Sequence, residues 1–77
     1  MMSNEEIIKK LLAEHFDISK DTVKLESNLF DDLGADSFDS IELVLELENN
    51  FDIEVLDEEI DNIQTVQDIL DLVDNLS

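Results

Sequence analysis

The chain has 77 residues, and its 22 Asp and Glu residues so outnumber its 4 Lys and Arg residues that the formal net charge is −18. A chain this short buries only about 60% of its unfolded surface, which predicts a single domain, residues 1–77, with a modest core. The absence of Cys excludes disulfides, thiolate metal ligands and a thiol nucleophile. Because such a charge repels nucleic acid and anionic lipid, we expect no nucleic acid partner and no membrane insertion, but partners with basic surfaces.

Apolar residues are numerous but scattered along the chain. There are 8 Ile, 12 Leu and 5 Val residues, too many for an acidic disordered tail, so we expect a folded protein. No apolar run is long enough to cross a membrane, and the first residues lack the basic and then apolar pattern of a secretory signal. We therefore expect a monomer located in the cytoplasm.

The first predicted helix covers residues 3–16. Ser3 can cap it, and Glu6 stands where it would complete a capping box. An apolar stripe with three- and four-residue spacing follows, formed by Ile7, Ile8, Leu11, Leu12 and Phe16. His15 lies in the last turn, where the helix dipole favours a cation, and we interpret it as a structural residue.

Residues 17–36 show no sustained periodicity and are expected to form a long loop between the first and second helices. Scattered apolar residues in this segment predict that the loop is held against the core, with single helical turns near Asp21 and Leu29. Gly34 is the only glycine in the chain, which indicates a backbone conformation that other residues adopt only at a cost in energy.

The rest of the chain predicts two further main helices and a short one. Residues 37–50 form the second main helix, residues 51–56 an extended connector, and residues 57–62 a short helix. Thr65 is the expected cap of the last helix, with Asp68 three residues later. The predicted fold class is all-α, a small four-helix bundle of three main helices and one short helix.

Successive residues of an α-helix lie about 100° apart around its axis, and this spacing divides the apolar residues of the predicted helix over residues 37–50 into two groups. The first group is expected to face the core and comprises Leu43, Val44, Leu47 and Phe51. The second group comprises Phe38, Ile41 and Leu45, with an acidic and polar border of Glu42, Glu46, Glu48 and Asn49. The second group either lies under the loop or is an exposed docking surface for a partner whose groove has a basic rim.

Charge is distributed unevenly along the chain. All lysines lie within the first 24 residues, whereas the segment from Glu26 onward carries 17 acidic residues and no basic one. Such a one-sided surface destabilises the folded state through self-repulsion. The pattern therefore suggests a surface that attracts basic partners.

The acidic junction at residues 31–39 allows more than one interpretation from its residues alone. An EF-hand calcium loop is excluded, because placing Gly34 at the sixth position puts Leu29 at the first, where a carboxylate is required, and we predict no metal site. Either Asp36 or Ser37 can cap the following helix. If Asp36 is the cap, the Ser37 hydroxyl stays free at the positive end of the helix dipole, a place suited to a phosphate ester.

The run from Leu33 to Val44, LGADSFDSIELV, resembles the signature of the acyl carrier protein family around its phosphopantetheine-bearing serine. The similarity continues through Asp57-Glu58-Glu59 to Thr65-Val66-Gln67, so that it covers most of the chain. Phe38 and Leu56 depart from the family, which usually has Leu and Pro at these positions. The length is that of a free-standing carrier of the type II fatty acid synthase kind.

This resemblance implies that Ser37 is the attachment site of a covalent 4'-phosphopantetheine, transferred from coenzyme A by a phosphopantetheinyl transferase with Mg²⁺. Growing acyl chains would then be carried as thioesters on the arm, in fatty acid or related polyketide or lipid biosynthesis, by a protein that is not itself an enzyme. The resemblance also implies docking to basic patches of synthesis enzymes and acyltransferases through Asp36, Phe38, Asp39, Ile41, Glu42, Leu45 and Glu48. Three residues are expected to line the interior that shelters the acyl chain: Leu47, Ile63 and Ile69.

The alternative is an unmodified acidic helical module that only binds other proteins. A hydrolase is disfavoured, because His15 is the only histidine and no motif gathers a serine and an acid around it.

Overall fold

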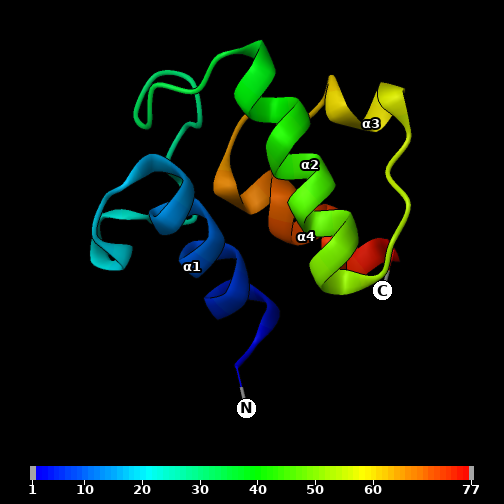
Figure 1. The fold of residues 1–77 in the computed structure, drawn as a ribbon, viewed down its shortest axis with the longest axis horizontal. Coiled ribbons are helices and arrows are strands. Elements are labelled where there is room, and N and C mark those ends of the chain that lie inside the picture. The colour runs from blue at the N-terminus through cyan, green and yellow to red at the C-terminus, as the bar shows by residue number, and fades with distance from the viewer. Residues whose placement is uncertain (1, 77) are drawn as a thin grey trace.

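The computed structural model describes residues 2–76, and its regular structure there is helical (Figure 1). In chain order the elements are α1 (Asn4–Phe16), the 3₁₀ turn η1 (Lys20–Thr22), α2 (Ser37–Phe51), α3 (Asp57–Ile60) and α4 (Val66–Leu76). Helix α1 packs against both α4 and α2, and the short α3 contacts α2. The predicted all-α fold with three main helices and one short helix is therefore confirmed. Among residues 2–76, no helix is both long and apolar enough to span a bilayer.

Helix α1 begins as predicted, but without the second half of the expected capping box. The Ser3 hydroxyl accepts a hydrogen bond of 3.2 Å from the backbone N–H of Glu6. The Glu6 carboxylate does not return to the cap, because it binds the ammonium group of Lys20 in η1 instead. An ion pair with a neighbouring element has thus replaced a local hydrogen bond.

The long loop is held against the core as expected, and it turns near both predicted positions, although only the first turn is a regular 3₁₀ helix. The η1 turn lies near Asp21 as predicted, whereas residues 29–32 form a single turn that does not extend into a helix. Asn28 caps this turn, because its side-chain oxygen accepts the N–H groups of Phe30 and Asp31 at 2.9 Å while its carbonyl accepts the Asp32 N–H at 2.9 Å. Leu29 is buried, and its N–H donates to the Gln64 carbonyl at 2.8 Å.

Gly34 adopts the left-handed conformation that the sequence indicated, with φ of +75°. A methyl group at this position would meet no atom within 4 Å, so the requirement comes from the backbone rather than from space. We expect Gly34→Ala to lower the free energy of unfolding by about 1 kcal/mol, measured by urea denaturation. A midpoint equal to that of the wild type would contradict this assignment.

The second half of the chain also follows the prediction closely. Helix α2 continues one residue further than expected, to Phe51, and Asp52 ends it in a left-handed conformation with φ of 54°. Helix α3 is shorter than predicted and ends at Ile60. At the start of α4, the Thr65 hydroxyl accepts the Asp68 N–H at 3.2 Å, and the Asp68 carboxylate accepts the Thr65 N–H at 3.0 Å.

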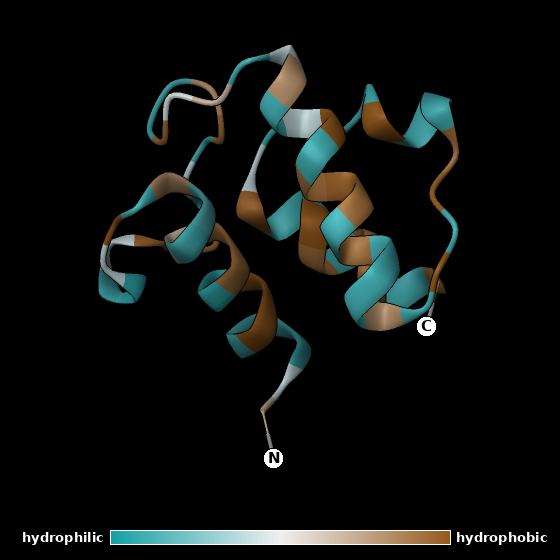
Figure 2. Ribbon diagram, viewed as in Figure 1, coloured by the Kyte–Doolittle hydropathy of each residue, from teal (hydrophilic) through white to brown (hydrophobic). Residues whose placement is uncertain are grey.

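The core is aliphatic and draws on α1, α2, α4 and the loops between them (Figure 2). Its buried members are Ile8, Leu12, Ala13, Val23, Leu29, Leu43, Val44, Leu47, Val55, Ile63, Val66, Ile69 and Val73. Helix α2 thus buries the face predicted for it. Its second apolar group, in contrast, is exposed to solvent and forms a candidate functional surface.

Candidate functional site

Asp36 is the residue that caps α2, and this decides the role of its neighbour. The Asp36 carboxylate accepts the Asp39 N–H at 3.0 Å, and the Asp39 carboxylate accepts the Asp36 N–H, also at 3.0 Å. This reciprocal capping box satisfies the N–H groups of Asp36 and Asp39 without using the Ser37 side chain. Ser37 is exposed, and its hydroxyl makes no hydrogen bond with the described residues. It is therefore free to act as an acceptor of a phosphate ester.

A groove of about 590 Å³ opens beside Ser37, between the long loop, α2 and α3. Phe30 lines it from the loop, Ile41 from α2 and Ile60 from α3. The rest of the lining is largely polar and includes Asn28, Asp31 and Asp61, so the groove suits a flexible chain with both polar and apolar parts. Ser37, where the resemblance places a phosphopantetheine arm, thus has a groove beside it, and the residues present would fit such a group.

A cavity of about 10 Å³ lies inside the bundle, below this groove. The three residues expected around a sheltered acyl chain, Leu47, Ile63 and Ile69, all line it. A volume near 10 Å³ holds about one water molecule, so the helices must separate before the cavity can take a larger guest. Three residues line both the groove and the cavity, and they mark the connection between the two: Ser40, Ile60 and Ile63.

The second apolar group of α2 is exposed to solvent rather than covered by the loop. Phe38 is 75% exposed, Ile41 53% and Leu45 55%. Of the neighbouring acids, Glu42 is exposed, whereas Glu48 is half-buried and accepts the Val55 N–H at 3.0 Å. The structure therefore brings the predicted docking residues together along α2, although the carboxylates of Asp36, Asp39 and Glu48 are already engaged within the chain.

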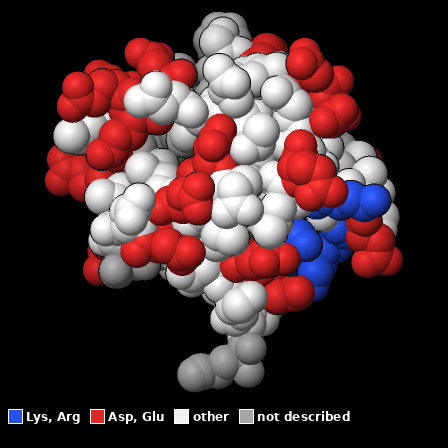
Figure 3. Space-filling view, turned by 180° about the vertical axis from the view of Figure 1, so that it is seen from behind, with Lys and Arg blue, Asp and Glu red and all other residues white. Residues whose placement is uncertain are grey.

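Acidic side chains are spread among uncharged residues over much of the face seen in Figure 3, while the basic ones gather at one edge. Among the lysines, Lys9 forms an ion pair with Glu5, and Lys20 forms one with Glu6. The lysines are therefore partly neutralised locally. The uneven charge seen in the sequence is kept in three dimensions.

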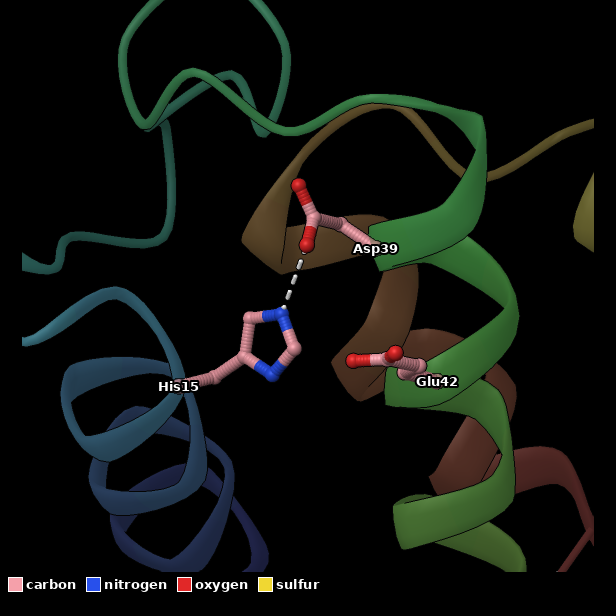
Figure 4. A group of neighbouring side chains, drawn as sticks. All are labelled: His15, Asp39 and Glu42. Carbon is pink, nitrogen blue, oxygen red and sulfur yellow. Dashed lines mark hydrogen bonds and ion pairs between the residues drawn. The ribbon is translucent and has the colours of Figure 1, made fainter.

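His15 has a role that the sequence did not predict. Its Nε2 lies 3.0 Å from Oδ1 of Asp39, so that it links the last turn of α1 to the first turn of α2 (Figure 4). The side chain of His15 is only 12% exposed. The interpretation of His15 as a simple partner of the helix dipole was incomplete, because a contact between residues 24 positions apart leaves no periodic signal in the sequence.

The His15 contact lowers the pKa of Asp39 below its ordinary value of 3.8, and the hydrogen bond from the Asp36 backbone adds to the effect. A carboxyl with a lowered pKa stabilises the fold above its unfolded pKa, and this contribution is lost as the pH falls through the folded value. We expect His15→Ala to raise the pKa of Asp39, measured by NMR titration of its side-chain carboxyl carbon. An unchanged midpoint would show that the backbone bond alone accounts for the shift.

Comparison with known proteins identifies the family. Residues 6–73 match the family described as "Phosphopantetheine attachment site". Over 75 residues the chain is 45% identical to an acyl carrier protein of Buchnera aphidicola subsp. Acyrthosiphon pisum (strain 5A), covering 97% of this chain and 94% of that protein.

Solved structures agree with this assignment. A candidate acyl carrier protein from Mycobacterium tuberculosis superimposes with a TM-score of 0.88 at 32% identity, covering 95% of this chain and 97% of the other. The acyl carrier protein from Enterococcus faecalis, described as having high thermal stability, gives a TM-score of 0.82 at 40% identity, covering 95% of this chain and 92% of the other. Both the sequence and the whole fold thus match acyl carrier proteins, which are carriers and not catalysts, and the matching family is that of the phosphopantetheine attachment site. The chain belongs to the acyl carrier protein family.

Proposed function

We propose that this carrier, which serves fatty acid synthesis, is loaded with 4'-phosphopantetheine on Ser37 and that residues 1–77 act as one carrier domain. One observation carries the proposal: Asp36 occupies the capping position, which leaves the exposed Ser37 hydroxyl at the start of α2 without a hydrogen bond to any of residues 2–76. The helix dipole favours the negative phosphate of the ester at this end. When bound, the arm supplies the thiol that holds acyl groups as thioesters.

The chain's own residues then position and shelter the cargo. The groove beside Ser37 gives the arm a surface to lie along, with Ile41 and Ile60 in contact with it. Because Ser40 and Ile63 line both groove and cavity, we place the entrance for an acyl chain between α2 and α3. Displacement of these side chains would admit the apolar cargo toward Leu47 and Ile69, where its burial is favourable.

Partner enzymes would bind along α2. The proposed docking surface comprises Asp36, Phe38, Asp39, Ile41, Glu42, Leu45 and Glu48. Its acids would steer the basic patches of the phosphopantetheinyl transferase, synthesis enzymes and acyltransferases, while the exposed apolar residues supply close contact. Glu42 is the acid best placed for this, because its exposed carboxylate makes no hydrogen bond or ion pair within residues 2–76.

We also propose that the protein works as a monomer in the cytoplasm. A reducing compartment keeps the thiol of the arm free for acyl transfer. A monomer leaves α2 accessible to one enzyme after another.

Peptide mapping tests the attachment site directly. The apo protein is incubated with coenzyme A, Mg²⁺ and a phosphopantetheinyl transferase, digested and fragmented in a mass spectrometer. One arm on Ser37 is the expected result. Attachment at another residue would overturn the assignment of Ser37, and no attachment at all would favour the unmodified interaction module.

A further inference from the structure

We propose that His15, Asp39 and Glu42 form a binding site for a transition metal ion such as Zn²⁺, which would join α1 to the first turn of α2. One ligand atom from each residue can be chosen so that all three atoms lie within 4.8 Å of one another. The three side chains point toward a common point between the two helices (Figure 4). Asp39 and Glu42 also belong to the proposed docking surface, but metal binding is measured on the free protein and does not require loading of Ser37, so its test can fail or succeed independently of the proposed function.

The donor set has the chemistry of a zinc site. Zn²⁺ binds imidazole nitrogen and carboxylate oxygen at about 2.0–2.2 Å, commonly with three protein ligands and an open fourth position. His15 offers Nε2, and its neighbour Asp39 offers Oδ1 only 3.0 Å away, so two of the donors are already adjacent. Glu42 is exposed, so its carboxylate is free to move the remaining distance.

The position of Asp39 is fixed from the other side. Its Oδ2 accepts the Asp36 N–H at 3.0 Å, which leaves Oδ1 directed toward His15. Hydrogen bonds of this kind orient carboxylate ligands and strengthen metal binding. The capping box of α2 therefore also supports one ligand of the proposed site.

The surroundings favour a cation as well. Glu46 lies seven residues after Asp39, on the same face of α2, and its buried Oε2 makes no hydrogen bond within the described residues. No lysine pairs with Asp39 or Glu42 among the ion pairs of residues 2–76. An ion at this position would reduce the repulsion among three carboxylates on one helix face.

The imidazole distinguishes this site from general attraction of cations to an acidic protein. Mg²⁺ and Ca²⁺ prefer oxygen ligands, whereas Zn²⁺ and Co²⁺ bind imidazole readily. We therefore expect one equivalent of Zn²⁺ or Co²⁺ to bind to the chelator-treated full chain more tightly than Mg²⁺. Co²⁺ bound in this way would show the visible d–d absorption of an ion of low coordination number.

The test is a titration of the wild type and three variants with ZnCl₂ and CoCl₂, followed by calorimetry and absorption. His15→Gln keeps a hydrogen-bond donor beside Asp39 but removes the imidazole, and Glu42→Gln removes the third ligand. Each should weaken binding roughly tenfold or more. Glu54→Gln, which removes one exposed charge outside the site, should bind like the wild type.

Two further readouts do not depend on the variants. At a Zn²⁺ concentration about 100-fold above the dissociation constant, the melting temperature of the wild type should rise by about 10 °C or more. The imidazole NMR signals of His15 should shift with the same midpoint. The proposal is overturned if these signals stay unchanged, if His15→Gln binds Zn²⁺ as tightly as the wild type, or if Mg²⁺ binds equally well.

Discussion

Ser37→Ala is expected to abolish attachment of phosphopantetheine completely, because the substitution removes the one hydroxyl at the start of α2 that is exposed and makes no hydrogen bond within the described part of the chain. The helix itself should remain intact. Asp36 caps α2 through the Asp39 N–H, and neither of these bonds involves the Ser37 side chain. Intact mass spectrometry after incubation with coenzyme A, Mg²⁺ and a phosphopantetheinyl transferase should show no added group.

Ser40→Ala is the matched control for this experiment. Ser40 lies one turn further along α2, is half-buried, and donates its hydroxyl to the Asp36 carbonyl at 3.4 Å. It should therefore accept no arm, and its variant should be loaded like the wild type. Loading of the Ser37 variant, or loss of loading in the Ser40 variant alone, would move the site away from Ser37. Circular dichroism shows whether each variant keeps its helices.

Ile41→Asp is expected to weaken binding to the transferase that loads the carrier by roughly tenfold to a hundredfold. Ile41 lies 53% exposed in the middle of the apolar residues of α2. Central apolar residues of a contact surface often contribute about 2 kcal/mol or more to binding, and a new carboxylate there would be desolvated without a partner. Surface plasmon resonance at fixed ionic strength measures the change in Kd.

Met2→Asp provides the comparison at the opposite end of the molecule. Met2 is 47% exposed and lies next to α1, so the same change in charge is made outside the docking surface. Its variant should bind the transferase almost like the wild type. Equal weakening by both substitutions would mean that total charge, not the surface of α2, governs the interaction. Because both side chains are exposed, neither change should lower the melting temperature much.

Local patterns were enough to predict most of the fold. The caps at Ser3 and Thr65 and the buried face of α2 follow from short-range spacing, since a helix repeats every few residues. Gly34 stood out as the only glycine, and its positive φ confirms why it is there. The family was also recognisable, because its motif around Ser37 is contiguous in the sequence.

Where the prediction was wrong, a local signal competed with a contact from elsewhere in the chain. Glu6 had the spacing of a capping box, but Lys20 bound its carboxylate. Near Leu29 a turn capped by Asn28 forms but does not extend into a helix, and the Leu29 N–H bonds the distant Gln64 carbonyl.

The sequence by itself therefore determined the helices, their caps, the negative charge and the serine within its motif, because each depends on residues close together in the chain. It left open whether Asp36 or Ser37 caps α2, and whether Phe38, Ile41 and Leu45 are covered. Only the tertiary structure decided these points, together with the pairing of His15 and Asp39. The physical reason is that exposure and contacts between helices depend on how the long loop places α1 against α2, which no periodicity encodes.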